Sequence, residues 1–99
     1  MTTVRDNLIA ARKLIEREDK WGKGEYEYQG FMCAIGAIAA VQCGSPGSAE
    51  RSEDGKALAS ALPDDMEKHT FYVTIYNDAP ETTHADILAL FDRAIAAQE

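Results

Sequence analysis

Five polar side chains in this sequence could take part in catalysis. Cys33 stands at the expected start of an apolar helix, where free backbone amides and the positive end of the helix dipole favour the thiolate nucleophile. His69 or His84 would then act as the general base, and Asn77 or Asp78 would orient the imidazole ring. The pattern is compatible with a small thiol-dependent enzyme whose catalytic candidates are Cys33, Asn77, Asp78 and His84.

Each of these candidates also has a structural interpretation, which we favour. Cysteine is among the most buried residue types and packs as a small apolar group. Asn77 and Asp78 precede Ala79 and Pro80, and their side chains are of the kind that braces a turn. His84 directly follows Thr83, the expected cap of the last helix, where the dipole favours a neutral imidazole. We therefore expect the protein to be non-enzymatic.

Metal and cofactor sites have no local motif in this chain. Neither histidine belongs to a His-x3-His or Cys-x2-Cys spacing, so a zinc ion would need scattered ligands from Cys33, His69, Asp78 and His84. The glycines do not form a phosphate-binding pattern. We expect no cofactor and no bound metal.

Aromatic residues supply the candidates for binding. Trp21, Tyr26 and Tyr28 stand on or beside the glycine-punctuated segment 22–30, and Tyr76 precedes Asn77. Aromatic side chains on such loops anchor protein interfaces. They could equally cover the exposed end of a small core. The leading hypothesis is an interaction or accessory module, capable of forming a homodimer, with Trp21, Tyr26, Tyr28 and Tyr76 as contacts.

The elements that position these residues are predicted to be helices. Thr3 and Asp6 have the spacing of a capping box, and they open a helix with an apolar stripe at Val4, Leu8, Ala11 and Ile15. Lys20 and Gly22 are its stop signals. Residues 31–42 carry no charge, which predicts a central helix surrounded by the others. Residues 44–48 are expected to form a break.

The second half of the chain gives clear signals only at its end. A third helix is predicted to begin between Ser48 and Ser52 and to end at Leu62, and residues 63–65 look like the first turn of another. Residues 70–76 are strongly β-prone, but a lone strand needs a partner and the only other candidate is residues 25–29. A short helix is therefore preferred, and a two-stranded ribbon of these two segments is the alternative. Thr83 and Asp86 cap a last helix with a stripe at Ile87, Leu88, Phe91, Ala94 and Ile95. The predicted fold is all-α, with four to five short helices packed around residues 31–42.

Length, charge and cysteine content limit the function classes. A chain of 99 residues forms one domain, here residues 1–99, and the 16 alanines allow a thin helical core. Because the net charge is -7, we expect no direct binding to nucleic acid and none to membranes. No signal peptide is apparent, so cytoplasmic localisation is expected. Cys33 and Cys43 would lie about 15 Å apart on one helix, too far for a disulfide.

Three sequence features together carry a family resemblance. They are the Trp21-Gly22 exit from the first helix, the run Phe-Met-Cys-Ala-Ile-Gly-Ala at 31–37, and Tyr-Asn-Asp-Ala-Pro at 76–80 before the last helix. The combination resembles an uncharacterised family of small bacterial and phage proteins, with a Cys-Ala-x-Gly-Ala helix and an aromatic-Asn-Asp turn. Tyr76 stands where tryptophan is more usual. The resemblance implies a helical fold without an assigned activity, and it directs attention to Cys33, Asn77 and Asp78.

Overall fold

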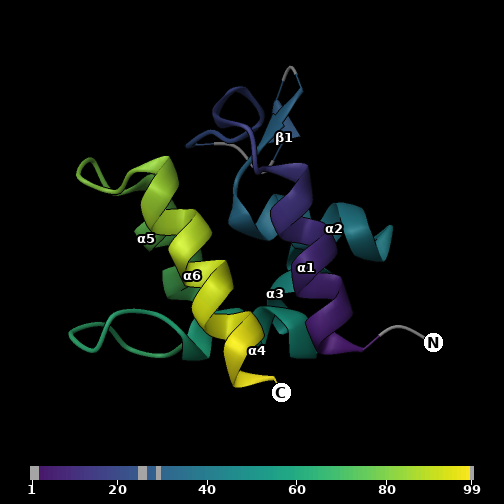
Figure 1. Ribbon diagram of the computed structural model, residues 1–99, viewed down its shortest axis with the longest axis vertical. Coiled ribbons are helices and arrows are strands. Elements are labelled where there is room, and N and C mark those ends of the chain that lie inside the picture. Colours follow the sequence, from purple (N-terminus) through teal and green to yellow (C-terminus); the bar gives the residue numbers. More distant parts are fainter. Residues whose placement is uncertain (1–2, 25–26, 29, 99) are drawn as a thin grey trace.

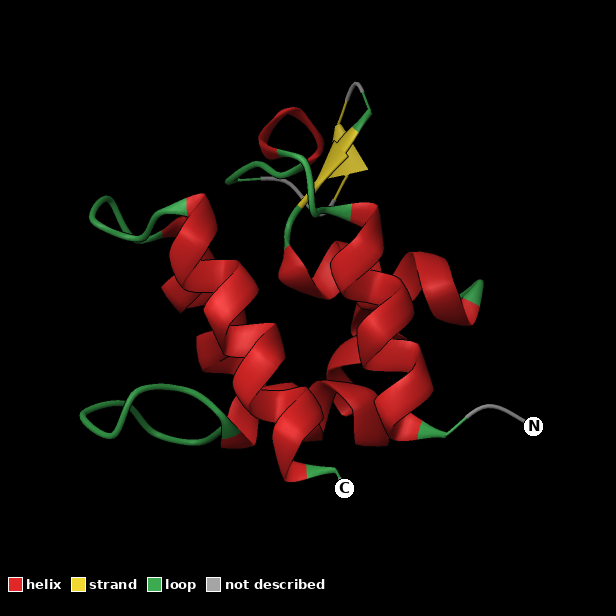
Figure 2. Ribbon diagram, in the orientation of Figure 1, coloured by secondary structure: helices red, strands yellow, loops and turns green. Residues whose placement is uncertain are grey.

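The computed structural model describes residues 3–24, 27–28 (backbone only) and 30–98. Within these residues it contains six α-helices, a 3-10 turn and two short strands (Figures 1 and 2). The helices are α1 (Val4–Leu14), α2 (Ala34–Gln42), α3 (Pro46–Arg51), α4 (Glu53–Ser60), α5 (Phe71–Asp78) and α6 (His84–Ala97), and the 3-10 turn is η1 (Glu18–Lys20). The strands β1 (Glu27–Tyr28) and β2 (Phe31–Met32) pair antiparallel. The predicted all-α class is confirmed.

Helix α2 is the central element of the fold. It contacts α1, α3, α4 and α5, and six consecutive residues, Ala34–Ala39, are buried. Its alanines and glycine allow these neighbours to approach closely, because small side chains keep the interhelical distance short. The first and last helices, α1 and α6, also contact each other and lie at the front of the view in Figure 1.

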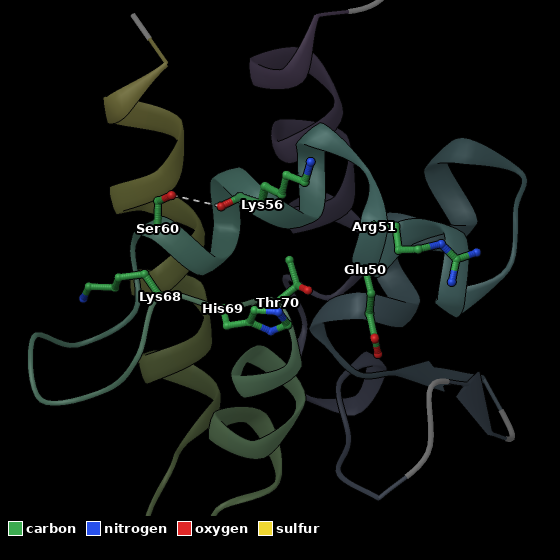
Figure 3. Close-up of a pocket in the computed structure, with 7 residues that line it drawn as sticks. All are labelled: Glu50, Arg51, Lys56, Ser60, Lys68, His69 and Thr70. Carbon is green, nitrogen blue, oxygen red and sulfur yellow. Dashed lines mark hydrogen bonds between the residues drawn. The ribbon is translucent and has the colours of Figure 1, made fainter.

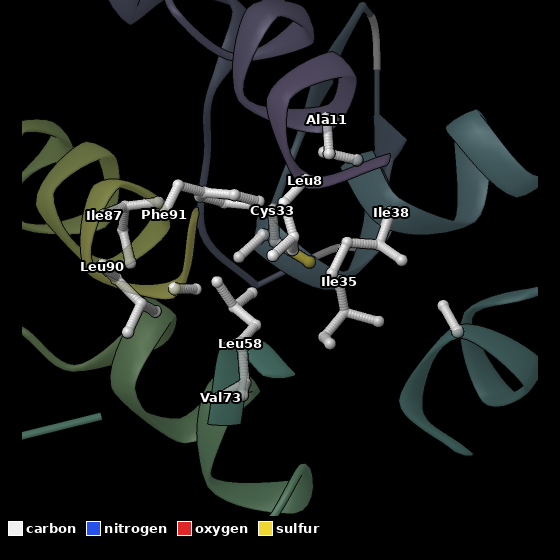
Figure 4. Packing of buried hydrophobic residues seen from close by; sticks show 14 of the residues in the cluster. Leu8, Ala11, Cys33, Ile35, Ile38, Leu58, Val73, Ile87, Leu90 and Phe91 are labelled. Atoms are coloured by element: carbon white, nitrogen blue, oxygen red, sulfur yellow. The ribbon is translucent and has the colours of Figure 1, made fainter. Parts of the chain in front are cut away.

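The core gathers apolar side chains from every helix. Leu8 of α1, Ile35 of α2, Leu58 of α4, Val73 of α5 and Phe91 of α6 are all fully buried, and Figure 4 shows that they converge. The stripes predicted for the first and last helices supply much of this cluster. The periodicity of the sequence therefore identifies the faces on which the fold closes.

Capping boxes begin the two outer helices, as predicted. The Thr3 hydroxyl accepts from the Asp6 amide at 3.1 Å, and the Thr83 hydroxyl accepts from the Asp86 amide at 3.2 Å. In both boxes the carboxylate accepts from the backbone amide of the threonine. A two-pronged contact from the Arg12 guanidinium to Asp92, at 2.8 and 3.4 Å, adds a link between α1 and α6.

Two predicted boundaries in the first half are wrong. The central helix begins at Ala34 instead of Phe31, because Phe31–Met32 forms a strand with Glu27–Tyr28. The predicted third helix is two helices that meet at Ser52, which caps α4 with its side chain. The first of them begins at Pro46, inside the predicted break, since Ser45 caps it and proline suits the first helical position.

Gly55 explains how the start of α4 can approach the backbone of α3 so closely. A Cβ atom at this position would overlap the carbonyl oxygen of Ala49 in α3. The glycine therefore permits a backbone contact that no other residue type would allow.

In the second half, residues 63–65 form a turn and no helix. The preference for a short helix in the β-prone segment is confirmed, with α5 spanning Phe71–Asp78. The alternative ribbon between residues 70–76 and 25–29 is wrong, because the only ribbon among the described residues pairs β1 with β2. Burial of Val73 and Asn77 on one face of α5 outweighs the β-propensity of the segment.

Candidate functional site

Asn77 is the centre of a buried hydrogen-bond network. Its side chain is fully buried, and its Oδ1 atom accepts from the Trp21 indole N–H at 2.8 Å and from the Ala34 backbone N–H at 3.2 Å. Its Nδ2 atom donates to the Gly22 carbonyl at 3.1 Å and to Asp78 Oδ1 at 3.0 Å. We call Trp21, Gly22, Gly24, Ala34, Asn77 and Asp78 the Asn77 clasp, because they join the exit of the first helical segment to α2 and α5.

The local backbone allows the clasp to form. A Cβ atom at Gly22 would overlap the ring of Phe31, so only glycine fits there. Gly24 has a positive φ of 86°, and its amide donates to Asp78 Oδ1 at 2.9 Å. Lys23 donates from its ammonium group to the Ala79 carbonyl at the end of α5, where cations are favoured. The Asn77-Asp78 pair therefore braces a long-range junction as well as a turn.

Cys33 lies at the N-cap of α2, with only 2% of its surface exposed. Its Sγ atom accepts from the Gly36 amide at 3.4 Å, and Figure 4 shows the sulfur among the core side chains. Burial raises the pKa of the thiol, and the Asp78 carboxylate raises it further, while the amides of α2 only partly oppose this. The lowered thiol pKa that a nucleophile would need is therefore not found.

His84 interacts with α1 instead of with the thiol. Its Nε2 atom lies 2.6 Å from the Ile15 carbonyl oxygen, and it must donate because a carbonyl can only accept. The ring also packs against Trp21, with centroids 5.7 Å apart. Among the described residues no hydrogen bond links either histidine to Cys33. The structure thus brings Asn77, Asp78 and Cys33 close together but does not provide the thiol with a base.

His69 is placed at the opposite end of α5 from Asn77. Its Nδ1 atom accepts from the Phe71 amide at 3.1 Å and so helps to begin the helix. In the part of the chain that is described, no three histidine, cysteine, aspartate or glutamate side chains are grouped as metal ligands would be. The scattered zinc ligands considered from the sequence therefore do not assemble there.

A cleft of about 690 Å³ opens beside the start of α5 (Figure 3). It is lined by the basic side chains of Arg51, Lys56 and Lys68, by His69 and Glu50, and by Ser60 and Thr70. Figure 3 shows that the charged ends of Arg51, Lys56 and Lys68 point away from His69 and Thr70. The Lys68 ammonium donates to the Leu62 carbonyl and, at 2.9 Å, to the Pro63 carbonyl. Since the charges do not converge, the cleft lacks the geometry of a built anion site. We call it the basic cleft.

A second cleft, of about 430 Å³, lies along the C-terminal half of α5. Ile75, Tyr76 and Ala79 form its α5 side, and Asp65, Glu81, Asp86, Pro63, Met66 and Thr82 complete it. We call it the acidic cleft, because its lining contains three carboxylates. Sequence reasoning found neither cleft.

The aromatic binding candidates have different environments. Trp21 is half-buried in the clasp, with the Lys23 ammonium 5.9 Å from its ring centroid. Tyr76 is half-buried and lines the acidic cleft. Tyr26 and the side chain of Tyr28 lie outside the described residues.

The large apolar side chains exposed on the described surface are others: Phe71 (57% exposed), Ile75 (43%) and Leu14 (39%). Phe71 and Ile75 stand one turn apart on α5, and we call them the Phe71–Ile75 face. Sequence reasoning missed this pair, because the β-prone composition of residues 70–76 hid a helical spacing. No helix in the described part of the chain is long and apolar enough to cross a membrane.

Comparison with known proteins gives one match. Residues 1–97 match the model of a family of unknown function, DUF6197. No curated protein and no solved structure matches the chain. The match agrees with the resemblance seen in the sequence, and it covers nearly the whole chain. The chain therefore belongs to the DUF6197 family, whose function is unknown.

Proposed function

We propose that this protein is a non-enzymatic interaction module that contacts a protein partner through the Phe71–Ile75 face. The main observation behind this proposal is that two large apolar side chains, Phe71 (57% exposed) and Ile75 (43% exposed), lie side by side on one helix. A single exposed apolar residue is ordinary, whereas neighbouring ones form the apolar centre typical of an interface. The basic cleft beside the start of α5 and the acidic cleft along its C-terminal half would supply the polar rim of this interface.

The environment of the candidate catalytic residues supports this proposal over the thiol-enzyme alternative. Asn77 uses its oxygen and its nitrogen in hydrogen bonds within the clasp, and His84 donates to a backbone carbonyl. Cys33 is buried, and its pKa is raised. A nucleophile requires the opposite properties, which are an accessible thiol and a lowered pKa.

The overall charge favours a protein partner. A net charge of -7 repels the phosphates of nucleic acids and of anionic membranes. We place the protein in the cytoplasm as part of the same proposal.

The proposal is tested by photo-crosslinking in cells. A benzophenone amino acid at position 71 should give adducts of defined mass, because this side chain would touch the partner. The matched control carries the same amino acid at position 14, where Leu14 is exposed on α1, away from α5. The proposal fails if position 71 gives no adduct, or only those that position 14 also gives.

A further inference from the structure

We propose that the acidic cleft binds an arginine or lysine side chain of a different, positively charged protein. This inference rests on the proposed function, since it gives the chemistry of the partner that contacts the Phe71–Ile75 face. Ile75 belongs both to that face and to the wall of the cleft, so one partner can contact both. The cleft, of about 430 Å³, lies within the range of roughly 300–1,000 Å³ that is typical of ligand pockets.

Two carboxylates of the cleft have no partner within the described chain. Asp65 and Glu81 are exposed, and their side chains make no ion pair or hydrogen bond with any described residue. The third carboxylate, of Asp86, is already used, because it accepts from the Thr83 amide at 2.9 Å. Two negative charges are therefore available to a cation from outside the chain.

The C-terminal end of α5 also favours a positive charge at this place. Ala79 borders the cleft directly after the last residue of α5, where the helix dipole is negative. One cation of the chain already lies there, because the Lys23 ammonium donates to the Ala79 carbonyl. Lys23 makes no ion pair with Asp65 or Glu81, so it leaves the charge of the cleft unpaired.

Thr82 is a second observation that indicates a ligand, and it does not depend on the charges. The residue lines the cleft, and only 5% of its surface is exposed. Its amide donates to the Ala79 carbonyl, but its hydroxyl makes no hydrogen bond with any described residue. Most buried hydroxyls have a partner, because leaving one unpaired costs free energy. Since Thr82 borders the cleft, a donor bound there would supply the missing partner.

The apolar part of the lining favours a cation that carries an aliphatic stem. Met66, Ile75 and Tyr76 line the cleft together with the acids. Arginine and lysine bury such a stem on apolar surface while the charged end stays with polar groups. A guanidinium also packs on an aromatic ring, such as that of Tyr76. A bare metal ion would gain nothing from this wall, and no group of metal ligands occurs in the described ranges.

Titration with a small guanidinium ligand, followed by NMR of the nitrogen-15-labelled protein, tests the cleft. Nα-acetyl-arginine amide should shift the backbone amide signals of Ile75, Tyr76 and Thr82 at constant ionic strength. The uncharged isostere Nα-acetyl-citrulline amide should leave these signals in place. Signals that do not respond to the arginine ligand, or that respond equally to both ligands, overturn the inference.

Three variants locate the binding. Glu81→Gln should raise the Kd of the arginine ligand about two- to fivefold, as expected for one exposed charge pair. Thr82→Val should raise it about two- to tenfold without lowering the melting temperature, because the hydroxyl has no partner in the free protein. Glu67→Gln removes the same charge from an exposed residue outside the lining and should leave the Kd unchanged. Equal effects of Glu67→Gln and Glu81→Gln, or a Kd that neither cleft variant changes, overturn the inference.

The crosslinking experiment separates failure of this inference from failure of the proposed function. With the benzophenone amino acid at position 71, Glu81→Lys should reduce the specific adducts, and Glu67→Lys should not. Adducts that persist in Glu81→Lys overturn the basic partner but leave the interaction module standing. An adduct of about twice the chain mass of 10.8 kDa does the same, since a second copy would also carry a net charge of -7. Absence of any specific adduct removes both.

Discussion

Replacing Asn77 by alanine should destabilise the protein more than any other single loss of a polar side chain. The substitution removes the acceptor of the Trp21 indole N–H and of the Ala34 backbone N–H, and it removes the donor to the Gly22 carbonyl. Each buried group left without a partner costs about 1–3 kcal/mol. Trp21 is only half-buried, so water can partly replace the hydrogen bond that its indole N–H loses.

The expected decrease in the free energy of unfolding for Asn77→Ala is therefore about 3–5 kcal/mol. The total free energy of unfolding of a domain of this size is about 5–15 kcal/mol. The melting temperature should fall by roughly 12–40 °C, at about 4–8 °C per kcal/mol. Asn7→Ala is the matched control, because its amide makes a single hydrogen bond, to Asp54 at 2.9 Å. Its cost should be about 1 kcal/mol.

Urea unfolding measures this difference with two independent signals. Circular dichroism reports the loss of helix, and the fluorescence of Trp21, the only tryptophan in the chain, reports the clasp directly. The clasp interpretation is refuted if Asn77→Ala costs no more than Asn7→Ala and leaves the tryptophan emission of the folded protein unchanged.

A variant of nearly identical shape adds a pH dependence of known sign. Asn77→Asp keeps an acceptor for Trp21 and Ala34 but sets carboxylate oxygens against the Gly22 carbonyl and the Asp78 carboxylate. Burial and this repulsion raise the folded-state pKa of the introduced carboxyl above its unfolded value. The loss of stability of Asn77→Asp relative to wild type should therefore be smallest at acidic pH, and it should grow as pH rises through the folded-state pKa.

Four further outcomes follow from the packing. Gly55→Ala should cost about 1–3 kcal/mol in chemical denaturation, because the new methyl overlaps the backbone of α3, whereas Gly47→Ala in the same region has room and should cost nothing. With Cys43→Ser as background, iodoacetamide should label Cys33 only as fast as the protein unfolds, and rapid labelling would revive the enzyme hypothesis. Because the pKa of Cys33 is raised in the folded state, stability should fall as pH rises above the ordinary thiol pKa of about 8.5, and Cys33→Ala should lack this alkaline loss in the same titration. Asp54→Ala should cost about 1–3 kcal/mol by thermal melting, since its carboxylate accepts amide hydrogen bonds from both α1 and α2, and a neutral result would refute its linking role.

Local signals in the sequence predict the outer helices well. Thr3 with Asp6, and Thr83 with Asp86, form the capping boxes that their spacing indicates. The apolar stripes behind them are the buried faces of α1 and α6. These features depend on residues within two turns of one another, so a single sequence contains the information that determines them.

The errors occur where distant residues decide the structure. Phe31 looks helical by composition, but backbone pairing with β1 places it in a strand. Glycine is unfavourable inside a helix by propensity, but Gly55 allows the Ala49 carbonyl to approach closely. Residues 70–76 have β-propensity and yet form α5, because the core accepts Val73 and the clasp accepts Asn77.

The resemblance directs attention to Cys33, Asn77 and Asp78 but does not indicate what these residues do. In the structure the three residues lie close together. The partners of Asn77, which determine what it does, stand 43 to 56 positions away along the chain. No local pattern can indicate such contacts.

The packing of α1 against α6 has a consequence for biosynthesis. Arg12 and Asp92 meet across 80 positions, and Leu8 shares its core with Phe91. While a ribosome still holds residues 84–97, the apolar stripe of α1 has no α6 to cover it. The nascent chain therefore exposes this apolar surface until residues 84–97 have left the ribosome, and cooperative folding must wait for that point.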